Sequence, residues 1–136
     1  MSTAGALKGV DKNHWKMFTE QDFTLDTLVK GMKRPALGCI VSFLGVVRDD
    51  GATKGMEITV DEQTAEIELM KLKRETLEKF DVEDVEIVHR KGSLDVGDSI
   101  VAILVGAAHR KDAFLACEYL IDVLRVSGAI RMKELK

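Results

Sequence analysis

A His-Arg pair at positions 109 and 110 is the pattern in this sequence most suited to chemistry. His109 and Arg110 follow an apolar run, Val101 to Ala108, and stand directly before a segment with helical periodicity. Two cationic side chains at a helix start add their charge to the helix dipole and to its unpaired N–H groups. An ordinary surface helix could begin in the same way. The junction nevertheless predicts an anion site suited to a phosphorylated small molecule.

Three further groups of cations could belong to a site. Arg48 follows a buried-looking strand beside a glycine-containing turn, where binding sites are often built. Arg125 and Lys133 lie at the end of the last helix and in the tail, and alone they would compensate the helix dipole. His89 and Arg90 end another strand before a tight turn. This position favours a structural histidine bonded to a backbone carbonyl, so we leave the pair out of the site.

Composition limits the class of protein. The 136 residues suffice for one domain, and 20 Lys+Arg against 23 Asp+Glu give a net charge of −3, which does not favour nucleic acid or a membrane surface. Cys39 and Cys117 are too far apart in the sequence for a zinc site or a redox pair, and we expect free thiols, no metal and no cofactor. There is neither a signal-peptide pattern nor a long apolar stretch. We expect a soluble, cytoplasmic protein.

Hydrophobic periodicity predicts three helices and several strands. The helices are expected over 25–32, 62–80 and 111–126, the strands over 38–47, 56–60, 85–89 and 99–105, and an extended tail over 129–136. Asp49-Asp50-Gly51 predicts a hairpin between the first two strands, and residues 91–98 are expected to form a loop. Residues 1–16 are expected to be a loose segment before one domain spanning residues 17–136.

This order of elements predicts an α+β fold. We expect a single domain with a mainly antiparallel sheet and three helices packed on it. A Rossmann fold is disfavoured because no Gly-x-Gly-x-x-Gly follows a strand and hairpin-like connections are frequent.

Four segments of the sequence together resemble a known family. They cover residues 43–48, 89–98, 108–114 and 119–124, with the sequences FLGVVR, HRKGSLDVGD, AHRKDAF and YLIDVL. In this order and at these spacings they resemble the large, catalytic subunit of molybdopterin synthase, and the resemblance extends from about Phe18 to Glu134.

The resemblance implies a hammerhead-like fold and a sulfur transfer in molybdenum cofactor biosynthesis. In that family a small ubiquitin-like subunit carries sulfur as a thiocarboxylate on its C-terminal Gly-Gly. The large subunit inserts this sulfur into cyclic pyranopterin monophosphate to form the dithiolene of molybdopterin. The resemblance also implies a homodimer that binds two small subunits, a heterotetramer. By matched position, Arg48, His109 and Arg110 would bind the phosphate and pterin of the substrate.

The chain departs from the family pattern at the catalytic lysines. The family has one lysine after the last helix and another in the tail, where this chain has Arg125 and Met132. Arginine keeps the charge but is a poor proton donor, so Lys133 is the expected replacement, with Arg125 as an electrostatic stabiliser. In an extended segment Lys133 would face away from position 132 unless the chain bulges.

Two functional classes remain open at this point. One is an active synthase whose catalytic residues are Lys133 and Arg125. The other is a non-catalytic relative that binds the small sulfur-carrier subunit or a phosphorylated pterin without converting it.

Overall fold

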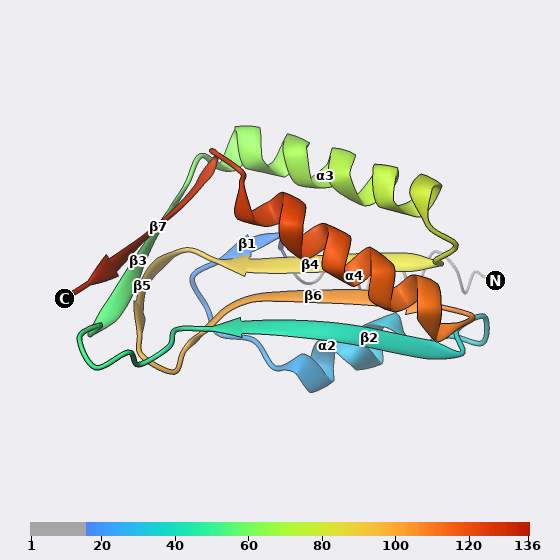
Figure 1. Ribbon diagram of the computed structural model, residues 1–136, viewed down its shortest axis with the longest axis horizontal. Coiled ribbons are helices and arrows are strands. Elements are labelled where there is room, and N and C mark those ends of the chain that lie inside the picture. Colours follow the sequence, from blue (N-terminus) through green and yellow to red (C-terminus); the bar gives the residue numbers. More distant parts are fainter. Residues whose placement is uncertain (1–15) are drawn as a thin grey trace.

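The computed structural model describes residues 16–136, which form three helices and seven strands (Figure 1). The helices are α2 (Leu25–Met32), α3 (Glu62–Lys79) and α4 (Arg110–Arg125). The strands are β1 (Phe18–Thr19), β2 (Cys39–Val46), β3 (Gly55–Val60), β4 (Asp84–Arg90), β5 (Gly92–Asp95), β6 (Ser99–Ala107) and β7 (Ile130–Leu135). The predicted α+β class with three helices in a single domain is confirmed. The expected loose segment, residues 1–16, lies outside the described residues except for Lys16.

A four-stranded sheet with the order β1-β4-β6-β2 forms the centre of the fold. β6 pairs antiparallel with both β4 and β2, whereas the short β1 pairs parallel with β4. The side chains of β6 are buried from Val101 to Ala107. This continuous apolar run suits a strand covered on both faces.

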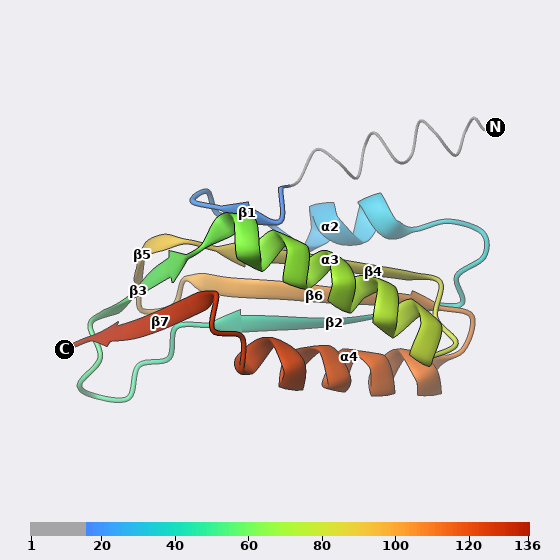
Figure 2. The same cartoon turned by 90° about the horizontal axis from the view of Figure 1, so that it is seen from above.

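Helices cover both faces of this sheet. Figure 2 shows α2 on one side of β4, β6 and β2 and α4 on the other. α3 lies on the same side as α4, where its buried residues Ala65, Leu69 and Leu72 join one core with Val85, Ile87 and Ile103 of the sheet. A smaller core on the α2 side contains Leu28, Met32, Val88, Ala102 and Leu104. Alternate residues of the central strands therefore belong to different cores, as expected for a strand.

A second sheet, with the order β5-β3-β7, is separate from the first. The predicted hairpin between residues 38–47 and 56–60 is therefore wrong: β2 pairs with β6, while β3 pairs with β5 and β7. The expected loop over residues 91–98 contains β5, and the pairing of β1 was also not predicted. These strands are short, so their local sequence shows little of the alternation that identifies longer strands.

Two ends of the four-stranded sheet matter for the site. At the junction end, where Cys39 of β2 pairs with Ala107 of β6, the chain passes from β6 into α4. At the cavity end, where Val46 pairs with Ser99, the second sheet adjoins the first (Figure 1). Gly38 closes the junction end, because a Cβ atom at this position would collide with the carbonyl oxygen of Ala108.

Candidate functional site

The predicted site residues are divided between the two ends of the four-stranded sheet. Arg48 lies two residues beyond the last residue of β2, at the cavity end, whereas His109 lies two residues beyond the last residue of β6, at the junction end. Eight strand residues at about 3.3 Å per residue separate these ends by about 25 Å. α4 leads back along the sheet, so Arg125 lies at the cavity end with Arg48. One chain thus brings Arg48 and Arg125 to the cavity end of the sheet but leaves His109 and Arg110 at the junction end.

The junction end presents the start of α4 to solvent. His109 is the N-cap residue, with extended backbone angles and no hydrogen bond from its side chain to the helix. His109 and Arg110 are both exposed. The first N–H groups of α4 therefore lie beside two exposed cationic or titratable side chains, an arrangement that can bind an anion. Asp112 in the first turn adds a negative charge that weakens this field.

An apolar cavity of about 180 Å³ lies at the cavity end, between the sheet, the last turns of α4 and β7. We call it the apolar cavity. The residues that line it are Phe43, Gly45, Val46, His89, Ile100, Val101, Ile103, Ile121, Leu124, Arg125, Ile130 and Met132. Arg125 is exposed and thus forms part of the mouth. An anion that enters this cavity would leave water and meet a guanidinium group there, where charge-assisted hydrogen bonds are strong.

The pairing of β7 decides which tail residues reach the apolar cavity. β7 pairs with β3 without a register shift, from Ile130 opposite Val60 to Leu135 opposite Gly55. Met132 lines the cavity, so its neighbour Lys133 lies on the other face of β7. In the strand pairing, Lys133 is the partner of Glu57 of β3. The bulge that would turn Lys133 toward the position of Met132 is absent from this strand. Its predicted catalytic role stays a prediction.

His89 was predicted to lie outside the site, but the structure places it beside the apolar cavity. As predicted, its ring bonds a backbone carbonyl, with 2.8 Å between Nδ1 and the oxygen of Arg90. The same side chain also lines the apolar cavity. Burial lowers its pKa, an effect that the bond to the Arg90 carbonyl opposes only in part. Nothing in the local sequence reveals the cavity, because its walls come from distant segments.

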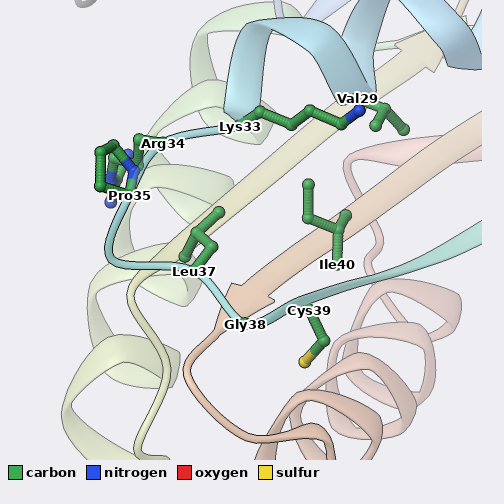
Figure 3. Close-up of a pocket in the computed structure, with 8 residues that line it drawn as sticks. All are labelled: Val29, Lys33, Arg34, Pro35, Leu37, Gly38, Cys39 and Ile40. Atoms are coloured by element: carbon green, nitrogen blue, oxygen red, sulfur yellow. The ribbon is translucent and has the colours of Figure 1, made fainter.

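A larger, more open groove of about 580 Å³ lies at the junction end, on the α2 side of the sheet (Figure 3). Its walls come from α2, the following loop and the start of β2, and its lining residues are Val29, Lys33, Arg34, Pro35, Leu37, Gly38, Cys39 and Ile40. Arg34 is held at 2.9 Å by Asp84 and at 3.0 Å by the carbonyl oxygen of Glu83. None of the predicted site residues lines this groove.

Two kinds of feature are absent from residues 16–136. No group of three or more His, Cys, Asp or Glu side chains within this range could hold a metal ion. No helix in the same range combines the length and the apolar character that crossing a membrane requires.

Comparison with known proteins places the chain in a family. Residues 18–127 match the MoaE protein family. The molybdopterin synthase catalytic subunit of Thermoplasma volcanium is 33% identical over 118 residues, which cover 83% of this chain and 85% of the relative. A molybdopterin synthase structure from Staphylococcus aureus is 30% identical with a TM-score of 0.82, covering 88% of this chain and 89% of that one.

A third match supports the fold alone. It is a chain of the Helicobacter pylori complex of subunits 1 and 2 of molybdopterin-converting factor, with 18% identity, a TM-score of 0.66, and coverage of 99% of this chain and 79% of that one. The family match spans most of the chain and includes Arg48, His109, Arg110 and Arg125. The chain therefore belongs to the MoaE protein family.

Proposed function

We propose that this chain is the catalytic subunit of a molybdopterin synthase. It would transfer sulfur from a thiocarboxylated small subunit to cyclic pyranopterin monophosphate and so build the dithiolene of molybdopterin. The relatives and the S. aureus structure support this activity. The observation in this chain that carries the proposal is the apolar cavity with Arg125 at its mouth.

We assign the apolar cavity to the C-terminal tail of the small subunit. At about 180 Å³ it is smaller than the roughly 300 to 1,000 Å³ usual for drug-sized ligands, so it suits a narrow chain better than a fused pterin ring. A Gly-Gly tail has no side chains to collide with Phe43 or Ile103. Its terminal thiocarboxylate is an anion, and Arg125 would pair with it at the mouth. The T. volcanium relative is named a catalytic subunit, which supports a second subunit of this kind.

We assign Arg48, His109 and Arg110 to the phosphate and pterin of the substrate. In one chain these residues lie at opposite ends of the sheet, about 25 Å apart by strand length. A second copy placed with its junction end at the cavity end of the first would unite them. We therefore propose a homodimer with two shared sites, which becomes a heterotetramer when each site receives a small subunit.

We propose Arg125 and Lys133 as the catalytic cations, with unequal roles. Arg125 lies at the mouth of the cavity and would stabilise negative charge there. Lys133 is exposed on the other face of β7, which is an edge strand of its sheet. Its long side chain could approach the cavity only around that free edge. We expect a smaller contribution from Lys133 than from Arg125.

The free thiols of Cys39 and Cys117 support the predicted cytoplasmic location. A reducing compartment keeps thiols free, and it also preserves a thiocarboxylate from oxidation. We propose that the reaction takes place there without a metal or cofactor bound to this chain.

A reconstitution experiment tests the proposed function. The purified chain is mixed with a ubiquitin-like small subunit that ends in a Gly-Gly thiocarboxylate and with cyclic pyranopterin monophosphate. We expect dithiolene product, measured as molybdopterin after oxidation to its fluorescent derivative. The same small subunit as a plain carboxylate is the control and should give none. Binding of the small subunit without any product would instead support the non-catalytic relative.

A further inference from the structure

His89 is held in a fixed position in the floor of the apolar cavity. It is the second-last residue of β4, pairs with Val101 of β6 and Phe18 of β1, and is only 2% exposed. The Phe18 ring lies 6.2 Å away, centroid to centroid, at a tilt of 44°. Strand pairing and ring contact therefore fix both the backbone and the imidazole.

The hydrogen bond of His89 determines which nitrogen carries the proton. A backbone carbonyl can only accept, so Nδ1 must donate to the oxygen of Arg90 at 2.8 Å. In a neutral imidazole the other nitrogen, Nε2, is then a hydrogen-bond acceptor. Burial lowers the pKa of the ring, which keeps it neutral at pH 7. Among residues 16–136, Arg90 is the hydrogen-bonding partner of His89, so Nε2 is not bonded within this range, and His89 lines the cavity.

The proposed sulfur transfer creates a step that needs a proton acceptor. When the thiocarboxylate sulfur bonds to a carbon of the substrate, the tail and the substrate are joined as a thioester. Release requires water: a C–O bond forms at the acyl carbon, and the C–S bond breaks with its electron pair on sulfur. One proton of the water passes to the base and then to the sulfur. The other leaves with the tail's carboxylic acid, which ionises. No oxidant or reductant is needed.

We propose that Nε2 of His89 is the general base that activates water to hydrolyse this thioester. The inference rests on the proposed function, because it assumes that the small subunit's tail occupies the apolar cavity. It assigns a catalytic role to a residue whose local sequence indicates only a structural one.

The other groups of the same copy that line the cavity cannot perform this step, and His109 of a second copy is assigned to the substrate phosphate and pterin. His89 and Arg125 are the titratable side chains that line the cavity. Arginine stays protonated at neutral pH and cannot accept a proton. The thioether of Met132 is too weak a base to accept a proton from water, and Lys133 lies on the far face of β7. Arg125 at the mouth can instead stabilise the oxyanion that forms on the acyl carbon. His89 and Arg125 thus supply complementary functions to one reaction.

A single-turnover experiment with the His89→Asn variant tests the inference. Asparagine places an N–H donor where Nδ1 stood, so the bond to Arg90 can persist while the base is lost. The full chain, the thiocarboxylated small subunit and cyclic pyranopterin monophosphate are mixed, quenched at intervals and analysed by intact mass spectrometry. We expect release of the small subunit to slow by about 100-fold, within the usual range for loss of a general base. The covalent adduct of small subunit and substrate should accumulate.

Two controls separate base catalysis from packing. Val88→Ala disturbs the packing of β4 in the core on the α2 side but leaves the imidazole and the cavity lining in place, so it should release the small subunit at nearly the wild-type rate without adduct. His89→Ala opens space for free imidazole, which should restore release about tenfold in this variant and leave His89→Asn unchanged. The inference is overturned if His89→Asn turns over like the wild type, if Val88→Ala accumulates the same adduct, or if imidazole fails to rescue folded His89→Ala. If the wild type itself forms neither adduct nor product, the proposed function fails instead.

Discussion

The two ends of the central sheet differ in how their functional groups are assembled. At the junction end, His109 and Arg110 are neighbours in the sequence, exposed, and placed by the start of one helix. At the cavity end, His89 comes from β4, Arg125 from α4 and Met132 from β7, and an apolar cavity brings them together. The first end can attract an anion from solvent. The second can remove it from water, which is the environment that sulfur transfer from an anionic tail requires.

The largest expected effect at the cavity end comes from substitution of Arg125. Replacement by alanine removes the cation from the mouth of the apolar cavity, and we expect sulfur transfer to fall by about 100-fold, the lower end for loss of an oxyanion-stabilising donor. Arg125→Lys should retain most of the activity because it keeps the charge. The rate of molybdopterin formation at saturating small subunit measures the effect.

Arg131→Ala is the matched control for Arg125→Ala. Arg131 is also exposed, but it lies on the face of β7 opposite to the side chains that line the cavity. Its loss should leave the rate near that of the wild type. Equal losses in the Arg125 and Arg131 variants would mean that overall positive charge, and not the cavity, determines the rate.

The shared site predicts a smaller effect at the junction end. Arg110→Ala and Arg48→Ala should each raise KM for cyclic pyranopterin monophosphate about tenfold, as expected for one charged hydrogen bond. This increase in KM should become smaller as salt is added, because salt screens exposed charges. Both side chains are exposed, so kcat should change less than KM.

Mixing these two variants tests whether two copies form one site. Each mixed dimer would contain one site with both substitutions and one intact site. At low substrate, where either variant alone is weak, the mixture should recover about a quarter of the wild-type activity after subunit exchange. Activity that simply averages the two variants would contradict a site shared between copies.

Lys133 should matter less than Arg125, Arg110 or Arg48. Because its side chain can approach the cavity only around the edge of β7, Lys133→Ala should lower the rate by about threefold through a screened charge. Met132→Lys places an amine directly at the cavity and should make the rate independent of Lys133. The double variant Met132→Lys/Lys133→Ala checks this. A complete loss in Lys133→Ala would show that β7 changes register during the reaction.

The smallest expected effect is a pH dependence of stability. The ordinary pKa of histidine is 6.5, and burial lowers the pKa of His89 in the folded chain. The unfolded state therefore binds the proton more readily, so the free energy of unfolding should be fully retained above pH 6.5 and fall as the pH drops below it.

Denaturant unfolding at about pH 7.5 and about pH 5.5, on either side of the ordinary histidine pKa, measures this dependence. His89→Asn should lose the part of the pH dependence that the buried ring contributes. His109→Asn should keep it, because His109 is exposed. If both variants lost the same part of the pH dependence, burial of His89 would not be the cause of that dependence.

The turn after β2 illustrates a correct local prediction with a wrong partner. The turn exists: Asp50 accepts hydrogen bonds from the N–H groups of Ala52 and Thr53, and Gly51 has a φ of +92°. However, the chain then enters the second sheet, where the N–H of Lys54 bonds to the carbonyl of Leu135. Turn residues specify how the backbone reverses, but the strand that follows can pair with any compatible edge.

The helices were predicted more accurately because their signals are local. The helix expected over 111–126 is found as Arg110–Arg125, and the one expected over 62–80 as Glu62–Lys79. Each shows apolar residues at a spacing that one helix face can bury. The position of His109 and Arg110 at the start of a helix could be predicted from the same local pattern. The position of His89 beside the cavity could not.

The sequence by itself determined the α+β class, the three helices, the cationic start of α4 and the resemblance to the family, because periodicity, capping and motif spacing depend on neighbouring residues. Only the tertiary structure decided that β2 and β3 belong to different sheets, that Met132 and not Lys133 lines the cavity, and that His89 lies beside Arg125. These outcomes depend on pairing between distant strands, and that pairing is selected by the burial of the whole core.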